Sequence, residues 1–475
     1  MQPANTIVIM ADEFRRDAMG CAGHPIVQTP HLDALAARGT RFTAAYTPSP
    51  ICVPARAAFA TGRQVHEIGT WCNAHPYSGN IESWHHRVRA AGHHVRSIGK
   101  LHFRGGPEDD PGFSASDIPM NVVGGVGDAL GLVRDEIIPR GATDKLAAMA
   151  GPGESDYTAY DRDILTHCRQ WLDQEAQKQD RPWVLFVSFV CPHYPLTAPQ
   201  EFYDLYDRPD LPMPKLYAEQ DRPHHPFLSD FAGCVDYDAH FKSEADVRRA
   251  IAGYYGLCSF IDLQVGAIVE AVENAGLTET TRVAFTSDHG ESLGARGMWG
   301  KSNMYEESAG IPLIVAGPSV PEATVEDAPR SLIDLSRFVL TSAGLPGDGF
   351  GTMDLFSDEQ EPVISEYHAT GSLSGAWMVR HKNWKYVHYA LYAPQLFDLG
   401  ADPEELTDLA SDPAYAEVLN ICRGLLEARL DPQAVHDRAL ADQGKRLAEL
   451  GGRDAVVKRG DFGFSPPPGV DPAFS

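Results

Sequence analysis

The residue with the clearest chemical potential is Cys52, which stands at the start of an expected helix and is followed one turn later by Arg56. Residues 55–61 are small and compatible with a helix. The start of that helix would present free backbone N–H groups and the positive end of the helix dipole at Cys52. The first interpretation is a thiol in a helix-start motif. The Cys-x-Pro-x-Arg pattern alone is too short to identify a function.

Two aspartates that closely follow expected strands could hold a hard metal ion. Asp12 comes after a strand over residues 7–10, and Asp288 and His289 come after a later strand. In open α/β sheets, ligands bind beyond the carboxyl ends of the strands. Oxygen ligands favour Ca²⁺, Mg²⁺ or Mn²⁺, and a histidine ligand shifts the preference slightly towards a softer ion than Ca²⁺. Each residue alone is more often a turn or helix cap, but together with Cys52 they predict a metal site.

Five further residues could supply positive charge or hydrogen-bond donors to an anionic substrate, and they are Arg56, Lys100, His102, His193 and Lys301. Fixed cations stabilise the negative charge that develops in the transition state of such a reaction. Lys100 and His102 stand two positions apart, so an extended segment would point both to one side. A single lysine is usually solvated and a single histidine is often structural, so only the whole set argues for an anion site.

The elements expected around these residues alternate between strands and helices. Helical spacing covers residues 31–37 and residues 247–275, and the longer helix carries one apolar stripe that ends at Gly276. Continuous apolar runs, typical of interior parallel strands, cover residues 7–10, 183–190, 282–286 and 313–316. The pattern predicts an α/β fold with a mixed, largely parallel central sheet sandwiched by helices.

The pattern changes near residue 360. Residues 414–450 are mostly helical, with a break expected at Asp431-Pro432. Short strands with close turns are expected at residues 362–366, 375–379, 385–389 and 395–398. We therefore divide the chain into a catalytic domain (1–360), a smaller subdomain of antiparallel sheet and helices (361–459) and a tail (460–475). The tail is either disordered or a docking arm in an oligomer.

Composition excludes several classes of function. The formal net charge is −25, which argues against a nucleic-acid partner because phosphate binding needs basic surfaces. The eight cysteines have no CxxC or zinc spacing and are expected to be mostly buried thiols. The first residues carry no basic stretch, and we see no run of the roughly 20 apolar residues that a membrane span needs. We expect a cytoplasmic protein with no membrane partner.

Taken together, the motifs resemble the signature of the type I sulfatases in the alkaline-phosphatase superfamily. The resemblance covers nearly the whole chain and is closest to the choline-sulfatase and phosphonate-monoesterase branch. It implies an alkaline-phosphatase-like fold. The motifs that carry it, in sulfatase order, are residues 29–33, 49–63, 99–102, 192–193, 287–290 and 300–301.

The resemblance implies a role for each candidate residue. Cys52 matches the cysteine that a formylglycine-generating enzyme oxidises to formylglycine (3-oxoalanine). Many sulfatases have two adjacent aspartates where this chain has Asp12 and Glu13, so the resemblance does not make Glu13 a ligand. The implied ligands of one divalent metal, with Ca²⁺ first and Mn²⁺ or Mg²⁺ as alternatives, are Asp12, Cys52, Asp288 and His289. The implied catalytic residues are Cys52, Arg56, Lys100, His102, His193 and Lys301. The implied substrate-binding residues are Asn73, Lys100, His193 and Lys301.

The resemblance also implies a mechanism. A hydroxyl of the hydrated aldehyde at position 52, activated by the metal and Arg56, attacks the sulfur of a sulfate ester. His193 or Lys301 protonates the leaving oxygen. His102 then removes the proton of the second hydroxyl, sulfate leaves and the aldehyde returns. The branch also implies a homo-oligomer, either a dimer or a tetramer.

The sequence leaves several substrate classes possible. We expect a sulfate monoester of an aryl or small alkyl alcohol. Choline-O-sulfate comes second, because the only aromatic residues between His102 and Tyr157 are Phe103 and Phe113, whereas a quaternary ammonium needs an aromatic cage or carboxylates. A phosphonate monoester or phosphodiester comes third. The residues that could line the pocket or equally belong to the core are Trp71, Tyr194, Tyr305 and Glu306. If Cys52 stays a thiol, the chain would be a non-catalytic metal- or anion-binding protein.

Overall fold

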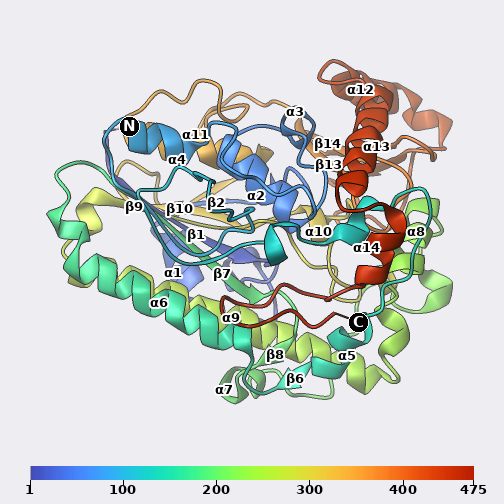
Figure 1. The fold of residues 1–475 in the computed structure, drawn as a ribbon, viewed down its shortest axis with the longest axis horizontal. Helices are drawn as coiled ribbons and strands as arrows, with labels where there is room; N and C mark the ends of the chain where they lie inside the picture. Colours follow the sequence, from blue (N-terminus) through green and yellow to red (C-terminus); the bar gives the residue numbers. More distant parts are fainter. Residues whose placement is uncertain (1, 475) are drawn as a thin grey trace.

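The computed structural model describes residues 2–474 and has an eight-stranded sheet at its centre (Figure 1). The strand order is β11-β2-β10-β9-β1-β7-β4-β5. The five strands from β9 to β5 are parallel, whereas β10 is antiparallel to β9 and β2. This is the mixed, largely parallel sheet that the sequence predicts. The strands are β1 (Asn5–Asp12), β2 (Gly39–Phe42), β4 (Val95–Lys100), β5 (Ala115–Met120), β7 (Val184–Pro192), β9 (Thr281–Ser287), β10 (Leu313–Ala316) and β11 (Thr324–Glu326).

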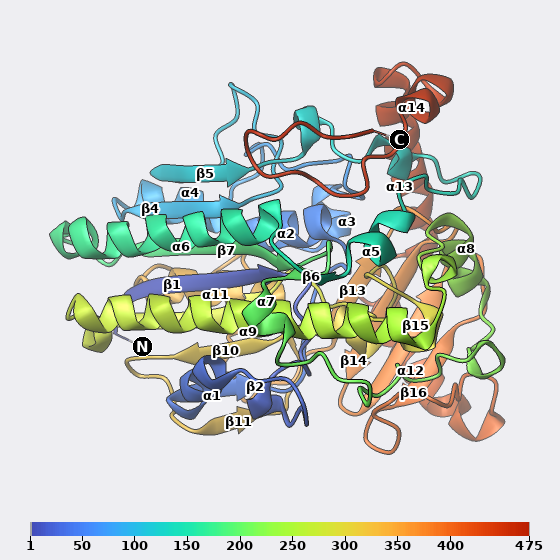
Figure 2. The ribbon, with the colours of Figure 1, turned by 90° about the horizontal axis from the view of Figure 1, so that it is seen from below.

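Helices cover both faces of this sheet because successive side chains of each buried strand point in opposite directions. In β1, Ile7 and Ile9 enter the core that the sheet shares with α1, α6 and α9. Val8 and Met10 enter the core shared with α2, α4 and α11. Figure 2 shows α6 and α9 lying along one face of the sheet. The covering helices are α1 (Pro30–Ala37), α2 (Cys52–Thr61), α4 (Trp84–Ala90), α6 (Asp156–Gln174), α9 (Glu244–Asn274) and α11 (Leu332–Ser342).

The helix α9 is long and apolar enough to cross a membrane by length and composition alone. The sequence alone does not predict this property. However, 67% of its apolar window is buried inside the protein, where Leu257, Ile261 and Val265 pack in the core beside α6 and the sheet. This burial is the pattern of a core helix.

A second, four-stranded antiparallel sheet lies at one end of the central sheet, with helices beside it, as predicted for the C-terminal region (Figures 1 and 2). The expected break at Asp431-Pro432 separates two helices, because Pro432 is the first residue of α13. The strands are β13 (Val363–Tyr367), β14 (Ala376–His381), β15 (Trp384–Tyr389) and β16 (Gln395–Asp398). The helices are α12 (Ala416–Glu427), α13 (Pro432–Glu449) and α14 (Arg453–Arg459).

Short elements complete the fold and carry parts of the loops around the sheet. The short strands are β3 (Ala45–Tyr46), β6 (Gly151–Pro152), β8 (Thr197–Ala198) and β12 (Arg330–Ser331). The short helices are α3 (Val65–Ile68), α5 (Asp144–Met149), α7 (Gln200–Tyr203), α8 (Pro226–Cys234) and α10 (Glu306–Ala309). All eight cysteines are free thiols, and all but the half-buried Cys21 are buried, as expected.

The fold brings the candidate residues to one edge of the central sheet. The strands β1 and β9 are parallel neighbours with Ala11 opposite Ser287, so Asp12 and Asp288 leave the sheet side by side. The parallel strands β4 and β7 end at the same edge, where Lys100 and His193 lie. The carboxyl ends of parallel strands are where such folds place their ligand sites.

Candidate active site

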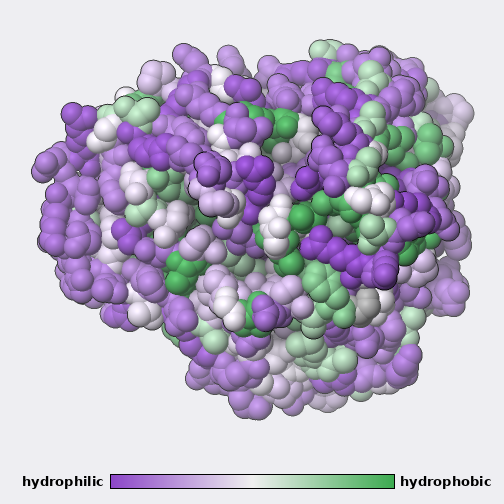
Figure 3. Space-filling model, viewed as in Figure 1, coloured by the Kyte–Doolittle hydropathy of each residue, from purple (hydrophilic) through white to green (hydrophobic). Residues whose placement is uncertain are grey.

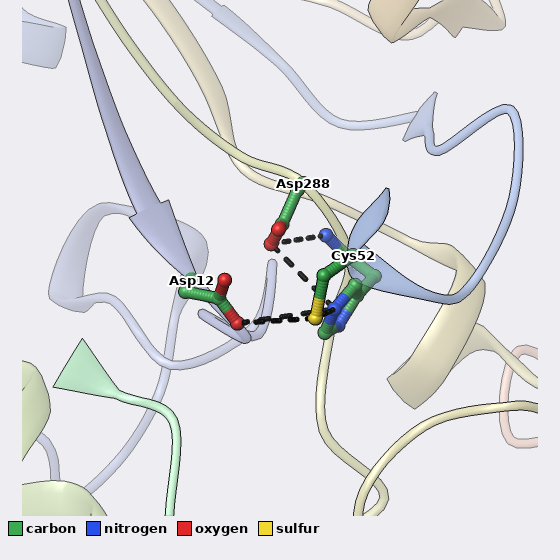
Figure 4. Close-up of side chains that lie close together, drawn as sticks. Asp12, Cys52 and Asp288 are labelled. Atoms are coloured by element: carbon green, nitrogen blue, oxygen red, sulfur yellow. Dashed lines mark hydrogen bonds and ion pairs between the residues drawn. The ribbon is translucent and has the colours of Figure 1, made fainter. Parts of the chain in front are cut away.

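Four buried side chains converge at the carboxyl end of β1. Cys52 is the first residue of α2, and its Sγ lies 3.1 Å from His289 Nε2 and 3.8 Å from Asp12 Oδ1. Figure 4 shows Asp12, Cys52 and Asp288 pointing toward one another. One ligand atom from each of Asp12, Cys52, Asp288 and His289 lies within 4.8 Å of the others. These are the four residues that the sulfatase resemblance implies as metal ligands.

The geometry of these side chains fits a divalent metal. Arg56 donates to Asp12 Oδ2 at 3.1 Å and to Asp288 Oδ2 at 2.7 Å, and Lys100 Nζ lies 2.5 Å from Asp12 Oδ2. These cations hold one oxygen of each carboxylate. The other oxygen, Oδ1, faces the thiol and the imidazole. Two buried carboxylate oxygens beside one imidazole form a donor set suited to Ca²⁺, Mn²⁺ or Mg²⁺.

The Cys52 thiol is poorly suited to act as a nucleophile itself. Burial raises its pKa to about 12, and the nearby Asp12 carboxylate adds to the shift. A thiol that stays protonated at neutral pH reacts slowly. The first turn of α2 does not compensate, because the Val53 N–H donates to the side chain of Asn73 at 3.1 Å. Asn73, which the resemblance places in the site, therefore fixes the start of α2 and also lines the cavity beside Cys52.

Lys100 and His102 both reach the site, but not as neighbours on one extended strand. The strand β4 ends at Lys100, and His102 has a φ of 53°, so the backbone turns between them. His102 lines the cavity, and its buried ring nitrogens have no hydrogen-bond partner within residues 2–474. Burial, and then the Lys100 and Arg56 cations, lower the pKa of His102 well below its ordinary value. The ring is therefore held neutral, with one unprotonated nitrogen.

His193 and Lys301 form a contiguous group with Glu13. Lys301 Nζ lies 2.7 Å from His193 Nε2 and donates to Glu13 Oε2 at 2.9 Å. His193 Nδ1–H donates a hydrogen bond to the Tyr194 carbonyl at 2.7 Å, so its unprotonated Nε2 can accept one from Lys301. Burial acts to lower the pKa of Lys301, whereas a Cys52 thiolate and the Glu13 and Asp12 carboxylates act to raise it well above its ordinary value. Because Cys52 itself stays protonated, the charge of the Lys301 ammonium is supported by its contact with Glu13 and by the nearby Asp12.

Glu13 is fully buried and is placed differently from the four ligand candidates. Its Oε2 bonds Lys301, and its Oε1 has no partner within the described residues. Ligand atoms of Asp12, Glu13 and His193 also lie within 4.8 Å of one another, but Lys301 already bonds both Glu13 and His193. Glu13 is therefore a hydrogen-bond partner of Lys301 in the structure, a role that the sequence does not predict.

The inner end of a cavity of about 130 Å³ is lined by Cys52, Asn73, His102, His193 and Lys301, and the buried charged residues described above lie next to them. Its outer end is aromatic and is built from distant segments. Part of it comes from the C-terminal tail, which leaves α14, crosses the face of the molecule and turns back (Figure 1). On this face, apolar side chains are exposed in patches among hydrophilic ones (Figure 3). The residues that line the outer end include Asp128, Arg140, Tyr194, Phe231, Tyr237 and residues 461–465.

The inner end is predictable from the sequence, whereas most of the outer end is not. Of the residues left open between pocket and core, Tyr194 lines the cavity. Trp71 lies in a core and donates to Asp442, while Tyr305 and Glu306 lie away from the cavity. The missed residues, from Asp128 to the tail, show no spacing that would identify them. Whether the tail also docks on a neighbouring subunit stays a prediction.

Comparison with known proteins identifies the family that the motifs resemble, over most of the chain. Residues 4–345 match the family described as Sulfatase, and residues 294–431 match the family described as N-sulphoglucosamine sulphohydrolase, C-terminal. A choline-sulfatase of Rhizobium meliloti (strain 1021) is 33% identical over 93% of this chain and 90% of its own length. Arylsulfatase K of Bos taurus is 28% identical over 86% of this chain and 78% of its own length.

Among solved structures, the phosphonate monoester hydrolase of Agrobacterium radiobacter has the same fold. It superposes with a TM-score of 0.74 and 26% identity, covering 90% of this chain and 95% of that one. These likenesses agree with the buried cysteine, the paired aspartates and the surrounding cations at the end of the sheet. The chain belongs to the sulfatase family and is a sulfuric ester hydrolase.

Proposed function

We propose that this protein hydrolyses sulfate monoesters of aryl or small alkyl alcohols, using a formylglycine made from Cys52 and one divalent metal. The observation that carries this proposal is the position of Cys52. It lies at the inner end of the cavity, with Asp12, Asp288 and His289 on one side and Lys301 on the other. A formylglycine-generating enzyme would be the partner that converts Cys52. The hydrated aldehyde would supply one hydroxyl that attacks sulfur and a second that allows sulfate to leave.

The metal would be held by Asp12, residue 52, Asp288 and His289. Ca²⁺ is the first candidate, with Mn²⁺ or Mg²⁺ as alternatives. When bound, the ion would neutralise charge on the sulfate and lower the pKa of a hydroxyl. Arg56 keeps the two carboxylates in place, because it donates to one oxygen of each.

The remaining residues would handle protons and charge. Lys301 brings Nζ to the inner end of the cavity, where it would donate a proton to the leaving oxygen. His193 Nε2 and Glu13 Oε2 hold that ammonium in position. His102 has a neutral ring that faces the cavity and would act as the base. Lys100 lies beside Asp12, and from this position it would add positive charge near the sulfate.

The outer end of the cavity favours an uncharged, apolar leaving group. Tyr194, Phe231 and Tyr237 give it aromatic surface. Its two carboxylates already face one guanidinium, because Arg140 bonds both oxygens of Asp128 and lies 3.8 Å from Asp461. A quaternary ammonium would therefore have to compete with Arg140 for these carboxylates.

Choline-O-sulfate is the second candidate, and a specific observation favours it. The Rhizobium meliloti choline-sulfatase is 33% identical to this chain over nearly its whole length. The aromatic residues at the outer end could also face a quaternary ammonium. A phosphonate monoester or phosphodiester is third, supported by the phosphonate monoester hydrolase with the same fold. Cytoplasmic location and a homo-oligomer, either a dimer or a tetramer, remain predictions from the sequence.

The test compares kcat/KM for 4-nitrophenyl sulfate, choline-O-sulfate and 4-nitrophenyl phenylphosphonate, using protein co-produced with a formylglycine-generating enzyme. We expect 4-nitrophenyl sulfate to lead by about tenfold or more, the discrimination that pocket contacts usually supply. A tenfold lead for choline-O-sulfate would replace the first candidate with the second. Hydrolysis of the phosphonate ester alone would overturn both.

A further inference from the structure

The C-terminal tail contributes five consecutive residues, 461–465, to the wall of the cavity that holds Cys52 and Lys301. They are fixed mainly by side chains of the catalytic domain that bind tail backbone carbonyls. Tyr157 donates to the Ser465 carbonyl at 2.6 Å, and Tyr194 donates to the Gly463 carbonyl. Lys145 Nζ donates to the Phe462 carbonyl at 3.3 Å. The segment is therefore a bound part of the site.

The ring of Phe464 packs into an aromatic group that reaches His193. Phe464 lies edge-on to Tyr157 and to Tyr194, with ring centroids 5.5 Å apart in each pair. Tyr194 stacks on His193 at 4.8 Å and 21°, and Tyr157 meets the same imidazole edge-on at 6.1 Å. Aromatic pairs at these separations are attractive beyond their burial. The tail thus contacts the two rings that flank His193.

The residues where the tail begins, from α14 to Asp461, pack against another part of the cavity wall. Val456 in α14 is buried against Ala129 and Leu130, which belong to the segment that also places Asp128 at the cavity. Asp461 accepts from the Ala142 N–H at 3.3 Å. The outer wall therefore combines two segments that are about 300 residues apart in the sequence and pack on each other.

We propose that residues 461–465 act in cis as a specificity-determining wall that encloses the leaving group. The substrates would be sulfate esters of small, single-ring phenols. This inference rests on the proposed sulfatase function and adds a size limit to it. The cavity of about 130 Å³ is well below the ~300–1,000 Å³ of pockets that hold larger ligands. Without the tail, the outer end would open to solvent, so a larger leaving group could enter and a single ring would lose aromatic contacts.

The test measures kcat/KM for a single-ring ester, 4-nitrophenyl sulfate, and for a fused two-ring ester, 4-methylumbelliferyl sulfate. The variants are a chain that ends at Arg459, which lacks the tail, and Phe464→Ala, which keeps it. The control is Val470→Ala, because Val470 is in the tail but is 44% exposed and lies outside the cavity. We expect the preference for the single ring to fall about tenfold in the truncated chain and less in Phe464→Ala. It should not change in the control.

A preference that stays within about twofold of the full chain in both variants, each confirmed to be folded by its thermal unfolding, would overturn the proposal, because pocket contacts discriminate by more than this. Failure of the full chain to hydrolyse either ester would count against the sulfatase function itself. Co-production of the tail-less chain with full-length Cys52→Ala tests whether the tail acts within one chain. We expect the truncated profile to persist. Restoration of the full-length preference would show that the tail acts across subunits and would contradict the cis assignment.

Discussion

The inner and outer ends of the cavity are built in opposite ways. The inner end consists of charged residues held by many ion pairs at strand ends and at one helix start, and Asp12, Arg56 and Asp288 are almost fully buried there. The outer end is mainly aromatic and comes from the region of residues 122–143, the loop after β7, helix α8 with the residues that follow it, and the tail. The inner end therefore has the groups for bond breaking, and the outer end has the surface that contacts the leaving group. Variants at the inner end should lower kcat, whereas variants at the outer end should alter KM and substrate preference.

The largest effect is expected at residue 52. Cys52→Ala should lower sulfate release more than about 10³-fold, because it removes the precursor of the nucleophile. Cys52→Ser should be nearly as inactive, since a sulfated serine could not eliminate sulfate as the aldehyde hydrate does. The matched control is Cys422→Ala, another buried cysteine, in α12 and outside the cavity. Activity of the serine variant equal to that of the unchanged protein would contradict the mechanism.

Metal removal should have the next largest effect. A chelator should abolish turnover, and added Ca²⁺ should restore it. Independently of activity, Ca²⁺ should raise the Tm of the stripped protein, by an amount that corresponds to about 2.7 kcal/mol when the ion is at 100 times its Kd. Asp288→Asn should lose most of this shift, whereas Asp117→Asn, on β5 and paired with Arg96, should keep it. Equal shifts in the two variants would place the ion elsewhere.

A smaller and more selective effect is expected at Lys301. Lys301→Ala should slow hydrolysis of an alkyl sulfate by about 10²–10⁴-fold, as expected for loss of a general acid. It should slow 4-nitrophenyl sulfate much less, because nitrophenolate leaves without a proton. Glu13→Gln should show the same pattern more weakly, since it keeps the side-chain volume but replaces one of the two carboxylate oxygens that can accept from Lys301. Equal losses for both esters would argue against proton donation by Lys301.

The smallest effect is expected at the outer end. Phe231→Leu should raise KM for 4-nitrophenyl sulfate by about tenfold or less and leave kcat unchanged, because it trims aromatic contact surface without touching the charged groups. Phe202→Leu is a suitable control, since Phe202 packs on Phe260 outside the cavity. A fall in kcat with KM unchanged would contradict the division of roles, in which the inner end breaks the bond and the outer end contacts the leaving group.

The same division explains what the sequence could predict. Asp12, Asp288 and Cys52 could be found because each stands at the end of a strand or the start of a helix that local patterns predict. The role of Glu13 could not be found in this way, because its partner Lys301 is 288 residues away. The position of His102 depends on a left-handed backbone turn that its sequence does not indicate.

The outer end could not be predicted for a related reason. Asp128, Tyr237 and Phe464 lie on irregular segments, and their meeting depends on the paths of long loops and on the tail packing against α6 and the loop after β7. No periodic pattern encodes such contacts. The sequence places choline-O-sulfate second because few aromatic residues lie between His102 and Tyr157. In the structure, the aromatic surface of the cavity comes from other segments, so this scarcity does not count against choline.

The most direct test of the account is the mass of the tryptic peptide that spans residues 42–56, which follows Arg41, ends at Arg56 and contains Cys52 as its one cysteine. It should be measured on protein that releases sulfate from 4-nitrophenyl sulfate. We predict the mass of the aldehyde at position 52, in a fraction that rises with specific activity across preparations. Fully active protein whose peptide carries only the unmodified thiol would contradict it.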